Sequence, residues 1–93
     1  MSFSTAPEIQ SEIAVNARKR RNWLKYSRQK ASELSGVPAP TIRKFEETGE
    51  ISLRQFLMLL QAYGDLSVMK NTFDNPPARS MDELIRLARR EGK

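Results

Sequence analysis

The chain has 93 residues, a formal net charge of +5, no cysteine and no histidine. This length suits one small domain, and the two missing residue types exclude disulfides, thiolate zinc sites and histidine-dependent catalytic triads. Because the sequence also shows no acid–base constellation and no nucleotide-binding loop, we expect a protein that is not an enzyme and that uses no metal or cofactor.

The first predicted helix begins near Glu8 and ends near Leu24. Apolar residues recur along it at intervals of three and four, which keeps them on one helix face; they are Ile9, Ile13, Ala14, Ala17 and Leu24. Its acidic residues stand near its start and its arginines near its end, and this order complements the helix dipole.

Capping residues delimit two short helices after it. One covers residues 28–35, with Ser27 as its N-cap and Gly36 as the glycine that ends it. The other runs from the prolines near its start, which are tolerated only in a first turn, to the residue before Gly49. The sequence therefore predicts two helices joined by a very short turn.

A fourth helix is predicted between the capping box Ser52–Gln55 and Gly64. Its apolar positions form an unusually wide stripe, typical of a helix buried on more than one side: Leu53, Phe56, Leu57, Leu59, Leu60 and Tyr63.

The pattern weakens after residue 65. Four apolar residues predict a short fifth helix and are candidates for a dimer seam: Leu66, Val68, Met69 and Phe73. A proline-containing linker follows, and a capping box, Ser80–Glu83, opens a C-terminal amphipathic segment with Leu84 and Leu87 as candidate partner contacts. The prediction is an all-α fold, a compact bundle of about five helices over residues 8–74, with a linker and a helical tail over 75–93.

Residues 28–47 have the pattern of a helix-turn-helix. Ala31 is small enough for two helices to approach closely, Gly36 makes the turn, and three apolar residues hold the second helix against the first: Val37, Ile42 and Phe45. The other side of the second helix faces outward with Ala39, Pro40, Arg43, Lys44 and Glu47. A helix of this size fits the DNA major groove, where an arginine can reach two acceptors of one guanine.

The positive charge is concentrated around this motif. Residues 18–44 carry nine basic side chains and one acid, a net +8, while the rest of the chain has a net −3. A charge run is often only a solvated helix face. Next to a helix-turn-helix, however, a run of basic residues favours a surface that binds the phosphate groups of nucleic acid.

These residues resemble a known family. From about Ile9 to Phe73 the chain is similar to the lambda-repressor-like, Xre-type helix-turn-helix regulators. Residues 45–53, FEETGEISL, resemble the subset of HipB-like antitoxins, and residues 77–84 look like the tails of that subset. The resemblance implies a homodimer that binds a palindromic operator in double-stranded DNA and represses an operon shared with a HipA-like kinase toxin.

The resemblance also implies roles for single residues. Arg28 and Gln29 would contact the phosphate backbone or a nearby base edge. The groove-facing set would be Ala39, Pro40, Thr41, Arg43 and Lys44. Glu46 would form a structural pair with Arg21 and tie the first helix to the third.

Three positions depart from the family pattern. Arg28 replaces the usual glutamine, which favours phosphate over base contact. Ala31 replaces a core leucine, so Trp23 or Tyr26 is expected to fill the space as core or rim packing, although exposed aromatic residues can also stack on bases. Thr48 stands before Gly49, which shifts the glycine by one.

Two other functions remain open. One is a stand-alone or prophage repressor with the same DNA chemistry, and the other is a module that binds a protein through the amphipathic segment 81–90. The longest apolar run, residues 56–60, is far shorter than the roughly 20 residues of a membrane span. No signal peptide is visible, so a cytoplasmic location is expected.

Overall fold

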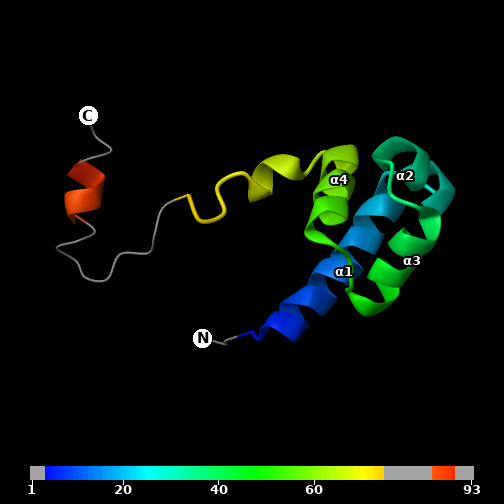
Figure 1. Ribbon diagram of the computed structural model, residues 1–93, viewed down its shortest axis with the longest axis horizontal. Helices are drawn as coiled ribbons and strands as arrows, with labels where there is room; N and C mark the ends of the chain where they lie inside the picture. The colour runs from blue at the N-terminus through cyan, green and yellow to red at the C-terminus, as the bar shows by residue number, and fades with distance from the viewer. Residues whose placement is uncertain (1–3, 75–84, 90–93) are drawn as a thin grey trace.

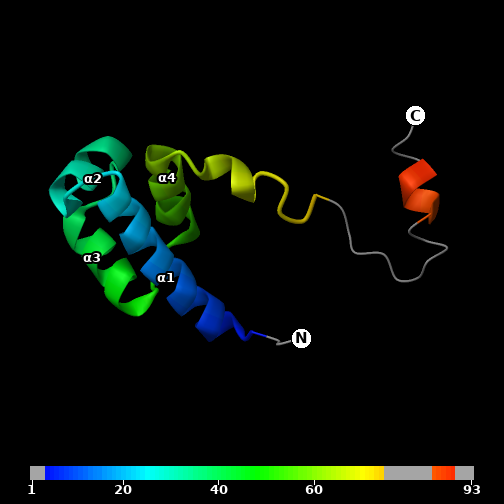
Figure 2. The ribbon, with the colours of Figure 1, turned by 180° about the vertical axis from the view of Figure 1, so that it is seen from behind.

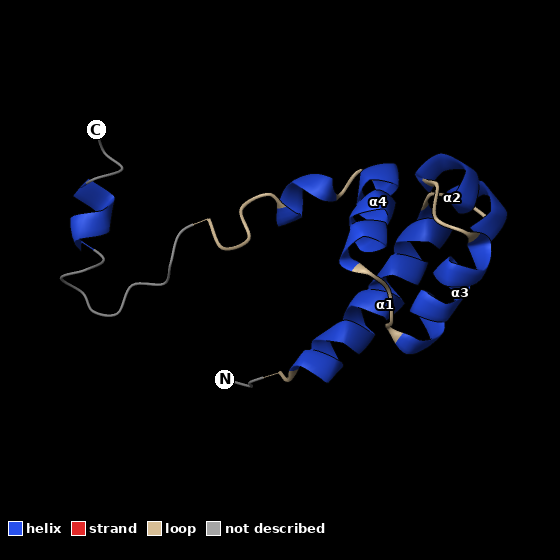
Figure 3. Cartoon of the chain, viewed as in Figure 1, coloured by secondary structure: helices blue, strands red, loops and turns tan. Residues whose placement is uncertain are grey.

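The computed structural model describes residues 4–74 and 85–89. These residues form four α-helices and one short 3-10 helix: α1 (Ala6–Trp23), α2 (Arg28–Ser35), α3 (Ala39–Thr48), α4 (Leu53–Tyr63) and η1 (Leu66–Met69). Residues 85–89 are also helical, and the described part of the chain contains no strand (Figures 1 and 3). The predicted all-α class is confirmed.

The helix boundaries follow the capping residues closely. The hydroxyl oxygens of Ser27 and Ser52 accept hydrogen bonds from the backbone N–H groups of Lys30 (3.0 Å) and Gln55 (3.1 Å), as N-caps do. Helix α1 begins at Ala6, two residues earlier than the sequence predicted. The reason is a cap at Thr5, whose Oγ1 accepts from the N–H of Glu8 at 3.3 Å.

The core lies among the four α-helices. Its buried apolar residues come from every α-helix and the α2–α3 turn: Ala14, Ala31, Val37, Ile42, Phe45, Leu59 and Tyr63. Figures 1 and 2 show α1 running diagonally along the bundle, with α2 and α3 on one side of it and α4 on the other.

The α2–turn–α3 unit has the packing that the sequence predicts. Ala31, Val37 and Ile42 are completely buried, so the second helix lies directly against the first. Gly36 ends α2 at a φ of +82°, a backbone conformation that costs glycine little because it has no Cβ.

The predicted short fifth helix is present as the 3-10 helix η1, which ends at Met69. Expectations about three apolar residues are wrong. Phe73, expected in that helix, lies beyond it with 97 % of its surface exposed. Of the two aromatic residues expected to compensate for the small Ala31, Tyr26 packs against the core, 6.3 Å from the Tyr63 ring, whereas Trp23 is 74 % exposed. Leu53, expected in the buried stripe of α4, is 68 % exposed because it lies in the first turn, ahead of the part of α4 that covers the core.

Of the C-terminal tail, the structure describes residues 85–89. Leu87 is half-buried and lies in the described residues 85–89. Three other predicted features lie outside the described residues: the linker after Asp74, the Ser80–Glu83 capping box and Leu84. Among the helices of the described ranges, none is long and apolar enough to cross a membrane.

Candidate nucleic-acid interface

The outward face of α3 carries the two basic residues that the sequence singled out. The side chains of Arg43 and Lys44 are 67 % and 64 % exposed. Pro40 is exposed on the same face, while Ala39 and Thr41 are half-buried at its start. The buried residues Ile42 and Phe45 face the opposite way, so core packing fixes which side of α3 is presented to solvent.

Both basic residues on this face form weak local ion pairs. Arg43 Nε lies 3.1 Å from Glu47 Oε1, one helical turn away, and Lys44 Nζ lies 3.4 Å from Glu50 Oε2. Exposed pairs of this kind contribute roughly 0–1 kcal/mol, so a stronger anion can displace the carboxylate at little cost. The two cations therefore remain available to another anion, because about two thirds of each side chain is exposed.

Behind this face lies a buried ion pair between α1 and α3. Arg21 donates from Nε to Glu46 Oε2 at 2.7 Å and from Nη2 to Oε1 at 2.9 Å, and its Nη1 donates to the backbone oxygen of Tyr26 at 2.9 Å. The hydrogen bond to Glu46 raises the pKa of Arg21, so the guanidinium stays charged despite its burial. The structural pair that the resemblance implies is therefore present.

Arg28, at the start of α2, shares the same carboxylate. Its Nε and Nη2 lie 3.1 Å and 3.0 Å from Glu46 Oε1, and 32 % of its side chain is exposed. Two arginines on one carboxylate leave a net charge of +1 at the junction of the three helices. Arg28, for which a phosphate contact is predicted, is thus paired with Glu46 and keeps part of its surface open to solvent.

Sequence reasoning does not find the pairing of Arg28 with Glu46. The arginine at a position where the family has glutamine is visible in the sequence, but the distance from Arg28 to Glu46 depends on how α2 packs across α3, which spacing along the chain does not give. Gln29, the next residue, is exposed beside it. Together the start of α2 and the outward face of α3 bring the predicted DNA contacts to one part of the surface.

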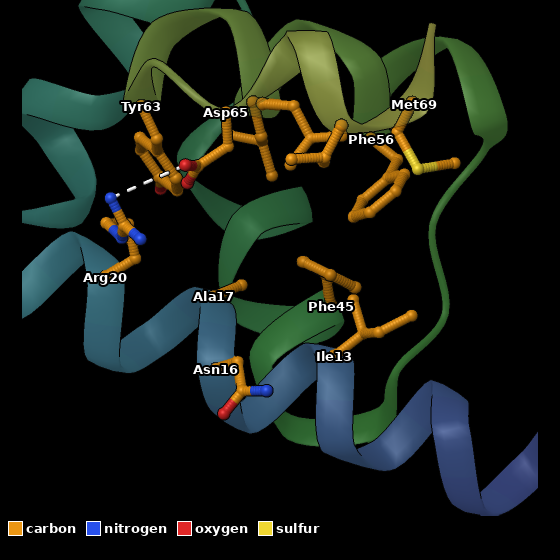
Figure 4. A pocket seen from close by; sticks show the side chains of 12 residues that line it. Ile13, Asn16, Ala17, Arg20, Phe45, Phe56, Tyr63, Asp65 and Met69 are labelled. Atoms are coloured by element: carbon orange, nitrogen blue, oxygen red, sulfur yellow. Dashed lines mark ion pairs between the residues drawn. The ribbon is translucent and has the colours of Figure 1, made fainter. Parts of the chain in front are cut away.

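A separate apolar hollow lies between α1 and the α4–η1 segment. It has a volume of about 280 Å³ and is lined mainly by apolar side chains, among them Ile13, Phe45, Phe56 and Met69 (Figure 4). At one end Arg20 Nη1 lies 3.5 Å from Asp65 Oδ1. Two candidate dimer residues line this hollow: Val68 is 72 % exposed, and Met69 is half-buried. A third, Leu66, is 38 % exposed and lies outside the lining.

The described ranges contain no group of three or more carboxylate, histidine or cysteine side chains arranged to hold a metal ion. In comparisons with protein-family models, with curated proteins and with solved structures, nothing matches this chain.

Proposed function

We propose that this protein is a sequence-specific DNA-binding repressor that acts in the cytoplasm as a homodimer. The observation that carries the proposal is the outward pair Arg43 and Lys44 on a helix whose opposite face is fully buried. A packed helix with exposed cations on its free side is suited to the major groove, where arginine donates to guanine O6 and N7 together.

The charge distribution supports the same reading. A net +8 within residues 18–44 supplies the sequence-independent attraction to phosphate on which such proteins depend. Arg28 fits a positioning role, because Glu46 fixes one side of its guanidinium while the other side remains open to a phosphate oxygen. Arg43 and Lys44 would then select the sequence, and Arg28 would set the register.

One recognition helix reads only a few base pairs, so a palindromic operator bound by two copies is part of the proposal. The further step, that the protein is the antitoxin of a HipA-like toxin and represses their shared operon, is supported by the resemblance of residues 45–53 to HipB-like antitoxins. A stand-alone repressor would share the DNA chemistry without the toxin. Co-purification of the protein with the product of an adjacent kinase-like gene separates these two cases.

The test is selection of bound duplexes from a random pool, followed by a salt titration of the selected site. The proposal expects a palindromic site whose half-sites are separated by about one helical turn, bound with an affinity that falls steeply as salt rises. If no sequence is enriched and all duplexes bind with the same affinity, the proposal of a sequence-specific repressor is overturned.

A further inference from the structure

One face of α1 is not used by the fold. We call it the outer stripe and define it by residues spaced three and four apart, all exposed: Ile9, Glu12, Asn16, Lys19 and Trp23. It lies on the far side of α1 from Arg21, which points into the bundle toward Glu46. In Figure 2, seen from behind, α1 runs in front of the other helices.

Two apolar side chains stand at the ends of the outer stripe. Trp23, the only tryptophan of the chain, is 74 % exposed at one end, and Ile9 is 41 % exposed near the other. Tryptophan is the residue type most often found at the energetic centre of protein interfaces. An exposed tryptophan that the core does not use therefore points to a contact with another molecule.

Trp23 has a cationic neighbour on the same helix. The Arg20 guanidinium carbon lies 5.6 Å from the centroid of the Trp23 ring, and Arg20 Nη1 lies 3.5 Å from Asp65 Oδ1. Asn16, Lys19, Arg20 and Trp23 together line a shallow hollow. The cation–π contact favours one orientation of the exposed ring, which reduces part of the conformational cost of binding.

The charges of the outer stripe are divided between its two halves. Glu12 is in the first half and Lys19 in the second, and within residues 4–74 neither has an ion-pair partner. A helix face that is acidic at one end and basic at the other complements a copy of itself in the antiparallel orientation. The parallel orientation would place Glu12 against Glu12, which is repulsive.

We propose that the outer stripe is the surface on which a second copy of this chain docks, with the two α1 helices antiparallel about a two-fold axis near Asn16. This arrangement puts Ile9 of each copy beside Trp23 of the other, and Glu12 beside Lys19. Asn16 meets Asn16 at the centre, where a polar residue fixes the register. The same surface patch serves both copies, as an isologous dimer requires.

This inference rests on the homodimer of the proposed function but not on DNA binding. The candidate seam after Gly64 amounts to one 3-10 turn. The outer stripe extends for roughly 21 Å along α1, at 1.5 Å per residue, and so offers a longer contact. Because it lies away from α3, docking there leaves the face with Arg43 and Lys44 uncovered.

The test is sedimentation of the full chain over a dilution series, with Trp23 fluorescence recorded on the same samples. The wild type is expected to dimerise, and its emission is expected to shift to the red as dilution exposes the ring. Trp23→Ala is expected to weaken dimerisation at least tenfold. Phe73→Ser, a change at an exposed aromatic residue outside the stripe, is the control that should leave dimerisation unchanged.

Reversal of charge tests the antiparallel register. Glu12→Lys and Lys19→Glu are each expected to weaken the dimer about threefold to tenfold, and the double variant is expected to recover most of the loss. A dimer that Trp23→Ala leaves intact but Phe73→Ser disrupts would overturn the outer stripe and keep the homodimer. A wild-type protein that stays monomeric at every concentration would overturn both the outer stripe as an interface and the homodimer. Binding of the monomer to a single DNA half-site would then test DNA recognition separately.

Discussion

Arg21 of α1 and Glu46 of α3 form a bidentate ion pair, with nitrogen–oxygen distances of 2.7 Å and 2.9 Å. The Glu46 side chain is only 2 % exposed, and Arg28 of α2 donates to the same carboxylate. The interaction joins three helices at a single carboxylate. It thereby fixes α3, which carries the proposed DNA contacts, relative to the two helices that support it.

Removal of Arg21 is expected to destabilise the fold strongly. Arg21→Ala leaves Glu46 buried with only the half-exposed Arg28 as partner, and breaking a buried pair in this way costs about 3–5 kcal/mol. Urea denaturation measures the loss. Replacement of both partners, Arg21→Met with Glu46→Leu, should recover much of it, because no buried charge then remains. A free energy of unfolding for Arg21→Ala equal to that of the wild type would contradict this role.

The turn between α2 and α3 is expected to favour glycine at position 36. Gly36 has a φ of +82°, and a Cβ there would lie 3.2 Å from Met58 Cε, closer than most such contacts. Gly36→Ala should therefore lower the free energy of unfolding by about 1–2 kcal/mol. Gly64→Ala is the matched control, because Gly64 has a φ of +85° but open space around its Cα. Thermal unfolding should rank Gly36→Ala as the less stable of the two; the reverse order would rule out crowding by Met58.

Tyr63 is expected to make stability fall at high pH. Burial, followed by the nearby Glu46 carboxylate, raises the pKa of Tyr63 from 10.0 to about 12. The Tyr63 hydroxyl then holds its proton more tightly in the folded state than in the unfolded state. Its contribution to the free energy of unfolding is therefore complete below pH 10 and is lost as the pH rises through 12. The loss amounts to roughly 3 kcal/mol, at about 1.4 kcal/mol for each pKa unit.

Tyr63→Phe isolates that contribution. The Tyr63 hydroxyl is buried without a hydrogen-bond partner in the described structure, so its removal should be neutral or stabilising near neutral pH. Urea denaturation of both proteins at several pH values is the measurement. The advantage of Tyr63→Phe should grow above pH 10, and parallel pH profiles would show that Tyr63 titrates alike in both states.

Much of the fold could be predicted from the sequence because its signals are local. Ser27, Gly36, Gly49 and Gly64 each act on their own helix end, and the helices begin or end beside them as expected. The buried positions of α3 also follow from spacing alone, since Ile42 and Phe45 must share a face.

What could not be predicted depends on distances between helices. The position of Trp23 at the end of α1 predicts packing against α2, but its ring is 74 % exposed, while Tyr26 packs against the core. The crossing of α2 over α3 brings Arg28 to Glu46, a contact that the sequence does not predict. The apolar residues after Gly64 predict a short helix correctly, but not that it ends at Met69 and leaves Phe73 exposed.

The most direct test of the account is the affinity of Arg43→Ala for the selected palindromic duplex. Arg43 makes one exposed ion pair with Glu47, so the variant should keep its fold. Specific binding should weaken by about 1–3 kcal/mol, with discrimination lost at one base position, while Lys70→Ala, which removes an equal charge from the end of η1, should bind like the wild type. A folded Arg43→Ala protein that binds the duplex at wild-type strength would contradict the claim that α3 reads DNA.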